Sequence, residues 1–507
     1  NGLFTGYVYT NMSLRGSVKY VDAVGAVSVS RTPVTVTLLY DMVWNGSAGT
    51  DWNTGANWNS GMVPTEVINV TIPDVTNDPV INWFGGVCND LTIESGASLL
   101  VDAGSFVTYG TVTNNGSFSI NVPQATDLWE LIGVPVSGAT ADIFLGNYLQ
   151  SYTEATDTWN EIIEPETPLV PGEGYALWVQ SKVGLFTYSG TPNTGNYSTD
   201  YTYTPTGNPL HYGFNLMGNP YPSYIDWDVL NETYGAVYQY DGYAYSSWNG
   251  TGTGSSFIDP GKGFLIAPAS SGSLLLTNAC RATQLPVKSA NATDNTVVIQ
   301  AGNENYMDEL YVVFNPEATD QFDLQYDAWK ILTDEDNIAQ VFSIMGEKNL
   351  SIDQQPMTTQ LPVGFTCGES GSYYFTLGDM TWEGPVYLED TKTGAIHDMH
   401  TGDYVFGYEV GEAGNRFILH FTTLGIDKPE ELSNVNVWST GNRVVVSSSE
   451  IFDNTGILIF DITGKKVFET NISQTNRFEM SPGLNTGLYF VKVLTGNVIT
   501  TRKVYIK

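Results

Sequence analysis

The sequence predicts an all-β protein, made of serial β-sandwich and short β-solenoid-like modules and ending in a small Ig-like sandwich. Its composition favours strands and tight turns, with 52 glycines and 30 tyrosines among 507 residues. Short apolar runs alternate with Gly, Asn and Pro clusters, whereas long amphipathic helix patterns are almost absent. The length exceeds what one hydrophobic core usually serves, so several domains are expected.

Charge divides the chain into two parts. The whole sequence carries 20 Lys+Arg against 54 Asp+Glu, a formal net charge of −34, which repels nucleic acid and anionic membranes. Residues 426–507 hold nine basic and eight acidic side chains, so they net +1 and residues 1–425 net −35. This change indicates a domain boundary, and the polar segment 425–433 is the expected linker.

Residues 1–43 are expected to be the last strands of a truncated upstream β region. Because the sequence starts at Asn1 rather than Met, we interpret it as a piece of a longer precursor. It opens without a charged-then-apolar secretory signal. No apolar run approaches the roughly 18 residues that cross a bilayer, so no membrane span is predicted.

Residues 44–122 form a module rich in Trp and Gly. Gly96, Gly104, Gly110 and Gly116 punctuate short strands at near-regular intervals. Such spacing is typical of stacked short strands, and we expect either a small β-solenoid or a sandwich.

Residues 123–288 carry one pattern twice, which predicts a duplicated β module with two repeats of about 85 residues. Matching Pro, Gly and Trp residues in one order are hard to obtain by chance, because each serves a turn or a large core contact. The matches are Gly133 with Gly218, Trp159 with Trp248, and Pro171 with Pro260.

Two further modules follow. Residues 289–425 contain strand-like runs separated by turns, which predict an antiparallel β-sandwich. Residues 426–507 contain short strands with turns at 463–464 and 496–497, enough for one small sandwich.

Enzymatic chemistry finds little support in the sequence. Only four histidines occur, and no G-x-S-x-G, H-E-x-x-H, Walker or Rossmann fingerprint is present. His397 and His400 have a metal-like spacing, but they lie between turn residues without a third ligand, so a solvated turn is favoured. Acid pairs for glycoside hydrolysis can be judged only from their separation in space. We therefore predict a non-enzymatic protein.

Acidic side chains and cysteines offer one further candidate each. Asp320, Asp323 and Asp327 could converge on Ca²⁺, but the segment lacks the Gly and bidentate Glu of an EF-hand loop, so capping or solvation is favoured and no cofactor is expected. Isolated buried thiols at the three cysteines are favoured over a bridge between two of them. The cysteines are Cys88, Cys280 and Cys367.

Aromatic side chains are the main candidates for ligand binding. A flat ring can cover one face of a pyranose at small entropic cost, and a surface glycan or polysaccharide would then be the partner. Core packing is the alternative and is favoured, since Trp and Tyr bury large areas in small β modules. The candidates are Trp44, Trp52, Trp58 and Trp248, together with Tyr240, Tyr243 and Tyr245.

The last 80 or so residues carry motifs that occur together in one family. They are Ile457-Leu-Ile-Phe-Asp-Ile-Thr-Gly-Lys-Lys-Val467, Leu484-Asn-Thr-Gly-Leu-Tyr-Phe-Val-Lys-Val493 and Arg502-Lys-Val-Tyr-Ile-Lys507. These residues resemble the type A C-terminal sorting domain of proteins exported by the type IX secretion system of Bacteroidetes. The Tyr-Pro-Asn-Pro-like opening common in that family is replaced here by Val-Asn-Val-Trp-Ser-Thr-Gly from Val435.

The resemblance implies a role in transport for six residues. It assigns the turn to Gly464 and Lys465, the core strand to Gly487 and Tyr489, and the end of the signal to Lys503 and Lys507. The implied partners are the outer-membrane translocon and its shuttle protein, and the implied location is secreted or on the extracellular face of the outer membrane, reached through the periplasm. In that family the tail is usually cleaved after passage.

The ordinary interpretation of these residues is simpler: Gly for a turn, Tyr for the core and Lys for solubility. Residues 486–507 carry four basic side chains and no acidic one. A basic final strand on so acidic a protein is hard to explain by solubility, so the signal is favoured.

Three hypotheses about the whole chain remain. The leading one is a non-enzymatic C-terminal region of a secreted or cell-surface protein, an adhesin or gliding-related, exported through the type IX system. The alternative is a set of ancillary carbohydrate-binding modules of a secreted hydrolase whose catalytic domain lies upstream. The third is a glycosidase within the duplicated module.

Overall fold

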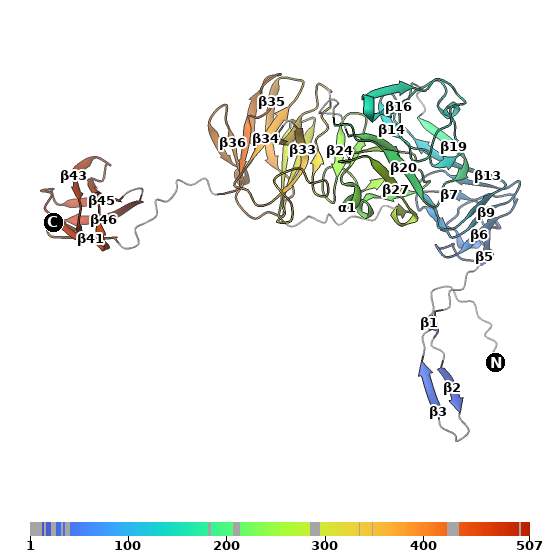
Figure 1. Cartoon of the computed structure of the whole chain (residues 1–507), viewed down its shortest axis with the longest axis horizontal. Coiled ribbons are helices and arrows are strands. Elements are labelled where there is room, and N and C mark those ends of the chain that lie inside the picture. Colours follow the sequence, from blue (N-terminus) through green and yellow to red (C-terminus); the bar gives the residue numbers. More distant parts are fainter. Residues whose placement is uncertain are drawn as a thin grey trace. The chain divides into compact units, whose positions relative to one another are not determined.

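The computed structural model describes residues 13–14, 17–21, 27–31, 34–35 and 41–507, except 181–183, 206–212, 284–294, 334, 347, 423–434 and 496–497. Contacts divide the chain into two compact units, 1–422 and 423–507. The all-β prediction is confirmed, because strands dominate both units (Figure 1). The one α-helix of the described residues, α1 (Asn231–Tyr234), is a single turn.

The first strands form two short antiparallel pairs. β1 (Ser13–Leu14) pairs with β4 (Val34–Thr35), and β2 (Ser17–Val21) pairs with β3 (Val27–Arg31). The second pair is therefore nested within the first.

Residues 41–123 form a parallel β-solenoid, one of the two architectures expected for this region. Parallel pairing links β5, β6, β9 and β12 on one face, β7, β10 and β13 on a second, and β8 with β11 on a third. One turn of the coil advances 21 residues, from Val70 to Leu91 and on to Val112. The strands are β5 (Asp41–Val43), β6 (Asn69–Ile72), β7 (Val80–Ile81), β8 (Gly86–Cys88), β9 (Leu91–Ile93), β10 (Ser98–Val101), β11 (Phe106–Thr108), β12 (Val112–Asn114) and β13 (Ser117–Pro123).

Two four-stranded antiparallel sheets follow, and they share one strand order. The first is ordered β14-β18-β16-β17 and the second β21-β26-β23-β24, so in each the first strand pairs with the fourth, the fourth with the second and the second with the third. Their strands are β14 (Trp129–Ile132), β16 (Tyr148–Thr153), β17 (Thr158–Glu161) and β18 (Tyr175–Trp178), then β21 (Asn215–Gly218), β23 (Val237–Tyr240), β24 (Tyr245–Trp248) and β26 (Gly263–Ile266).

Seven further strands of this region lie outside these two sheets. β13 of the solenoid pairs with β19, and β20 pairs with β27. β22 lies between β25 and β28. The strands are β15 (Val136–Ser137), β19 (Leu185–Pro192), β20 (Tyr197–Tyr201), β22 (Tyr224–Asp226), β25 (Phe257–Ile258), β27 (Gly272–Leu276) and β28 (Arg281–Ala282).

Residues 296–420 form one 11-stranded sheet that folds over its own core. Rings from strands far apart in the sheet order meet there: Phe365 lies 5.1 Å from Phe406, and Phe375 lies 4.7 Å from Phe417, between ring centroids. The pairing is antiparallel except between β30 and β33. The strands are β29 (Thr296–Gly302), β30 (Met307–Phe314), β31 (Ala328–Trp329), β32 (Gln340–Met345), β33 (Lys348–Gln355), β34 (Gln360–Thr366), β35 (Gly371–Leu377), β36 (Tyr387–Asp390), β37 (Ala395–Asp398), β38 (Tyr404–Tyr408) and β39 (Phe417–His420).

The boundaries placed at 122/123 and 288/289 do not separate independent cores. One apolar cluster runs from Met42 in the solenoid to Tyr188 in β19. Another joins Leu131, Leu265 and Ile352, which come from both four-stranded sheets and the 11-stranded sheet. Composition changes at these positions, but the apolar faces of neighbouring modules are buried against one another, so residues 41–422 pack as one unit.

The C-terminal unit is a small antiparallel sandwich. One sheet is ordered β40-β41-β44 and the other β43-β42-β45-β46, with an apolar core between them. The linker expected at 425–433 and the turn at 496–497 lie outside the described residues. The strands are β40 (Val435–Thr440), β41 (Arg443–Phe452), β42 (Thr455–Phe460), β43 (Lys466–Ile472), β44 (Thr475–Met480), β45 (Gly487–Thr495) and β46 (Val498–Ile506).

Candidate functional site

The turn between β42 and β43 is built around Asp461. Its Oδ1 accepts hydrogen bonds from the backbone N–H and the hydroxyl of Thr463, at 2.9 and 2.6 Å, and from the N–H of Lys465 at 3.1 Å. The bond from the Thr463 hydroxyl, followed by those from the two backbone N–H groups, lowers the pKa of Asp461. Gly464 has φ +82°, a conformation that glycine adopts without strain, and Lys465 is exposed.

Gly487 and Tyr489 lie on β45 and differ in their structural role. Tyr489 is 9% exposed in the core of the sandwich, and its hydroxyl donates to Asn485 O at 2.9 Å. A Cβ added to Gly487 would meet only ordinary contacts, the closest at 3.5 Å from the ring of Tyr489. Packing therefore explains Tyr489, whereas neither space nor φ requires glycine at 487.

Lys503 and Lys507 lie on or directly after β46, the edge strand of its sheet. Both are exposed. Lys503 pairs across the strands with Phe490, and the backbone N–H of Lys507 donates to Gly441 O at 3.0 Å. The Ser439 hydroxyl donates to Tyr505 O at 2.6 Å, so the C-terminal end of this edge is already bonded to the β40–β41 turn.

The outer face of this sheet carries a feature that the sequence motifs did not single out. Directly paired residues share a face, which places Phe490 and Lys503 together, with Tyr505 and Lys492 beside them. Phe490 is 38% exposed and Tyr505 51% exposed. We call these four residues the basic-aromatic face. Alternation along β45 and β46 was the signal that could have found them.

Three of the four tryptophans named as possible ligand-stacking residues are core residues, as the favoured interpretation of core packing expects, and ligand stacking is wrong for these three. Trp44, Trp52 and Trp58 are 1%, 0% and 2% exposed. Their rings pack edge to face, with centroids 5.0 Å apart between Trp44 and Trp58 and 4.8 Å between Trp52 and Trp58. All three belong to the apolar core of the solenoid, where the ring of Trp52 also lies 5.6 Å from that of Phe106, so no ring face is left for a sugar.

Trp248, the fourth, is half-buried at the end of β24. Its indole N–H donates to Asp228 Oδ1 at 2.6 Å, and its ring packs against the core of the second four-stranded sheet. Trp248 pairs with Val237 at the far end of its hairpin, whereas Trp159 pairs with Tyr152 near its turn. The two Trp-Asn pairs matched in sequence thus occupy different positions in the ladder.

The side chains of most of the metal candidates lie within hydrogen-bond distance of backbone groups around them. Nε2 of His397 lies 2.8 Å from Gly402 O, and Nε2 of His400 lies 3.1 Å from Gly384 O. Asp323 Oδ2 accepts from Thr319 N at 2.6 Å, and the oxygens of Asp327 accept from Asp323 N and Gln354 N at 2.7 and 2.8 Å. Across the described residues, no group of three or more His, Cys, Asp or Glu side chains could hold a metal.

The three cysteines, Cys88, Cys280 and Cys367, are buried and unbridged. Burial raises the pKa of Cys88 and of Cys280, which keeps both as inert thiols.

A groove of about 380 Å³ lies where both four-stranded sheets meet residues 331–333 and 335. Tyr152 and Trp159 pair across β16 and β17, with ring centroids 4.9 Å apart, and Tyr240 and Tyr245 pair across β23 and β24 at 4.6 Å. We call it the aromatic groove. It is lined by Tyr152, Asp157, Trp159, Phe214, Tyr240, Tyr245, Leu265, Ile331, Leu332, Thr333 and Glu335.

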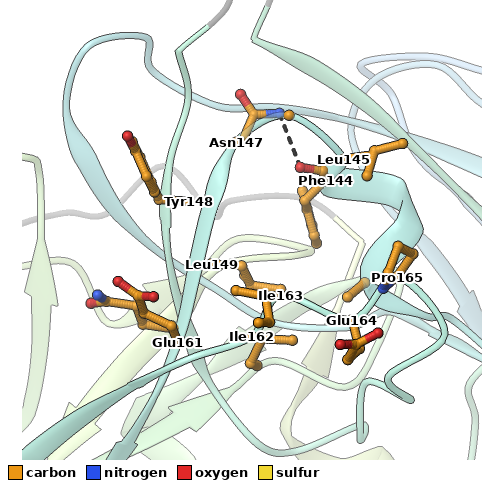
Figure 2. A pocket seen from close by; sticks show the side chains of 13 residues that line it. Phe144, Leu145, Asn147, Tyr148, Leu149, Glu161, Ile162, Ile163, Glu164 and Pro165 are labelled. Atoms are coloured by element: carbon orange, nitrogen blue, oxygen red, sulfur yellow. Dashed lines mark hydrogen bonds between the residues drawn. The ribbon is translucent and has the colours of Figure 1, made fainter.

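A second hollow of about 260 Å³ lies on the first four-stranded sheet (Figure 2). Leu149, Ile162 and Ile163 gather at its centre, with Glu161 and Glu164 to either side. Asn147 closes one end by donating to Phe144 O at 3.3 Å. Its polar groups lie on the rim, so it offers mainly apolar contact.

Residues 440–507 match the family described as the secretion system C-terminal sorting domain. The terminal unit thus defines a class: a secreted β protein that carries its own export domain. The chain therefore ends in a type IX secretion sorting domain, and such substrates reach the cell surface or the extracellular space. Nowhere in the described part of the chain is there a helix of the length and apolarity needed to cross a membrane.

The body of the chain identifies the family. Residues 43–128 and 228–421, together more than half of the chain, match the domain of unknown function DUF8693, so the chain belongs to that family. The two matched segments leave out 129–227, which hold the first four-stranded sheet.

Solved structures show only distant similarity. PorZ, a surface component of the type IX secretion system of Porphyromonas gingivalis, is 9% identical with a TM-score of 0.14, over 66% of this chain and 63% of that one. This chain thus spans less than two thirds of the length of PorZ. A biofilm-associated protein BSP domain is 8% identical with a TM-score of 0.13, over 77% of this chain and 92% of that one. TM-scores this low establish no shared fold. No curated protein matches the chain.

Proposed function

We propose that this protein is a non-enzymatic adhesin-like module that the C-terminal sandwich delivers to the cell surface. The observation that carries the proposal is the separate compact unit 423–507, whose residues 440–507 match the sorting domain. A unit with its own apolar core can be recognised, and removed, without unfolding the body.

The basic-aromatic face is the surface we propose for docking to the translocon or its shuttle protein. Aromatic rings supply buried contact area, and lysines supply charge that steers an acidic partner. The C-terminal end of the β46 edge is bonded to Ser439 and Gly441, which favours docking on the face of the sheet over strand addition at that end. The roles of Gly464, Lys465, Gly487, Tyr489, Lys503 and Lys507 in the signal are part of this proposal.

The body, in this proposal, contributes binding rather than catalysis. Its modules share cores, which makes a rigid support for surface contacts. The common strand order of the two four-stranded sheets supports a duplication within 123–288. The alternative function, ancillary carbohydrate-binding modules of a secreted hydrolase, is favoured by one observation: the aromatic groove.

Export of a reporter tests the proposal. Residues 426–507 are fused to a periplasmic reporter in a host with the type IX system, beside a version that ends at residue 495 and so lacks β46. We expect the full fusion at the cell surface and the truncated one in the periplasm. A third fusion, Phe490→Ser with Tyr505→Ser, keeps the strand and removes the exposed rings. Export of all three to the same extent would contradict the proposal.

A further inference from the structure

We propose that the aromatic groove binds an uncharged saccharide chain. This inference rests on the proposed function, in which the body acts as a binding module at the cell surface. The groove is lined by the hairpin β16–β17, the hairpin β23–β24 and residues 331–333 and 335, together with Phe214 and Leu265. Its volume of about 380 Å³ falls within the range of small-molecule sites.

The aromatic rings supply the stacking surface. Trp159 is 44% exposed, although it packs against Tyr152. Phe214 and Leu265, each 7% exposed, lie beneath as an apolar floor. One face of a pyranose presents mostly C–H groups, which pack on a ring face with its partial negative charge.

The polar groups suit a polyol. The hydroxyl of Tyr152 donates to Asp157 Oδ1 at 3.0 Å, which orients that carboxylate at the groove. Glu335 also lines the groove. Its backbone N–H donates to the hydroxyl of Thr333 at 3.3 Å, and that hydroxyl donates to Tyr243 O at 2.7 Å. Carboxylates accept hydrogen bonds from neighbouring sugar hydroxyls, and such charge-assisted bonds are stronger than neutral ones.

Charge and ring geometry decide between ligand classes. Asp157 and Glu335, on a body with a formal charge of −35, repel uronic acids and sulfated or sialylated glycans. An organic cation would fit the charge, but a cation cage needs ring faces that stand apart around the ligand. Here the rings of each pair lie against each other, with centroids 4.6 and 4.9 Å apart and tilts of 32° and 45°. The paired rings therefore do not stand apart as the walls of a cage, and the exposed ring of Trp159 remains for stacking on one face of a pyranose.

Glycan binding by the full chain tests the inference. The wild-type protein is applied to an array of neutral and acidic glycans, and choline and trimethyl-lysine are titrated separately. We expect neutral glycans to bind, with acidic glycans and both ammonium compounds far weaker. The variant Trp159→Ala removes one stacking ring and should lower the affinity for glycan about tenfold, because a ring contact of about 1.4 kcal/mol corresponds to a tenfold change in Kd.

Two further variants show whether binding takes place in the groove. Trp83→Ala removes a tryptophan that is 80% exposed but does not line the groove, and it should bind as the wild type does. Leu332→Arg places a long side chain at an exposed lining position, so it should block the groove without disturbing a core. It therefore decides the question even where Trp159→Ala folds poorly.

Several results would overturn the inference. They are the absence of any neutral glycan signal, preference for choline or acidic glycans, an equal loss in Trp83→Ala and Trp159→Ala, or unchanged binding by Leu332→Arg. Export of the Trp159→Ala chain is measured in parallel. Normal export without glycan binding would contradict the role proposed for the groove and leave the sorting role standing. Glycan binding without export would contradict the sorting role and leave that of the groove.

Discussion

The body and the C-terminal sandwich place their charges in opposite ways. In the body, charged side chains are buried within the core: Arg281, Asp390 and Arg416 are 6%, 0% and 8% exposed. In the described residues of the sandwich, the buried polar side chains are Thr455 and Thr500, both uncharged. The body buries charge at a module junction, at Arg281, and within the 11-stranded sheet, in the Arg416–Asp390 pair. The described part of the sandwich keeps its charged side chains out of the core, where a partner can contact them.

Arg281 illustrates how the body fixes a junction. Its guanidinium donates to Thr108 O at 2.6 Å in the solenoid, to Ser223 Oγ at 3.2 Å and to the Thr194 hydroxyl at 3.1 Å. It also lies 4.6 Å from the ring of Tyr221. Burial lowers its pKa to about 10, so it remains charged at physiological pH. One side chain thus ties the solenoid to the three-stranded sheet β25-β22-β28, in which Arg281 lies on β28.

The largest effect is expected from breaking a buried ion pair in the body. Arg416 Nε and a terminal nitrogen donate to the two oxygens of Asp390, at 2.8 and 2.6 Å. Arg416→Met leaves the Asp390 carboxylate buried without its partner and should cost about 3–5 kcal/mol. The control is Arg443→Met in the sandwich, where the pair with Glu479 is exposed and should cost less than about 1 kcal/mol.

Amide hydrogen exchange, resolved by segment, measures both free energies. Costs of similar size in the two variants would show that burial does not distinguish the two regions.

The next largest difference between the two regions is expected in how their stability depends on acid. Burial alone would raise the pKa of Asp390, but hydrogen bonds from Arg416 and Tyr404 outweigh it and hold the pKa well below its usual range. The pKa of Glu154 behaves in the same way. Burial would raise it, but hydrogen bonds from Thr202, Gly213 and Thr204 outweigh burial and lower it. A carboxyl with a depressed folded pKa stabilises above its unfolded value and loses that contribution as pH falls.

We therefore expect the stability of the body to fall below about pH 4, near the unfolded values of these carboxyls. Asp327 acts in the opposite sense at higher pH, because burial raises its pKa to about 7. Urea unfolding followed by tryptophan emission reports the body, since Trp438 is the one tryptophan of residues 423–507 against 12 in the chain. Asp390→Asn should flatten the acid limb, and an unchanged limb in this variant would contradict the assignment.

The turn at Gly464 tests the sandwich alone, with a smaller effect. Gly464→Ala places a Cβ at φ +82°, which should cost about 1–2 kcal/mol. The position is open, with no atom within 4 Å of the added Cβ, so the cost comes from the backbone and not from a clash. Gly464→Asn is the matched control, because Asn tolerates this conformation better. Exchange protection of 461–466 measures both, and equal protection would exclude backbone strain.

Local structure and local motifs could be predicted from the sequence better than the packing of side chains. Turn glycines and strand periodicity identified the all-β class, and the motifs in 457–507 identified the sorting domain, because both depend on residues close in sequence. The burial of Trp44, Trp52 and Trp58 was not decided, since an aromatic residue suits a core and a binding surface equally.

The aromatic groove shows the same limit. Tyr240 and Tyr245 were named as candidates, but Trp159 was noted only as a repeat match and Glu335 was not noted at all. These residues lie on three segments that only the tertiary fold brings together. The match of Trp159 with Trp248 pointed away from the groove, because the two rings occupy different ladder positions.

Substitution of Lys503 should change the stability of the sandwich least among these variants, but it should change transport strongly. It is exposed on β46, so Lys503→Glu should alter the stability of the sandwich by no more than about 0.5 kcal/mol. The same substitution reverses charge on the basic-aromatic face and should lower surface export of the reporter fusion, because an acidic partner would now be repelled. Arg443→Glu makes an identical charge change on the other sheet and should export normally. If both variants lose export equally, net charge rather than this face is what the machinery senses; if neither does, the sandwich is recognised through some other surface.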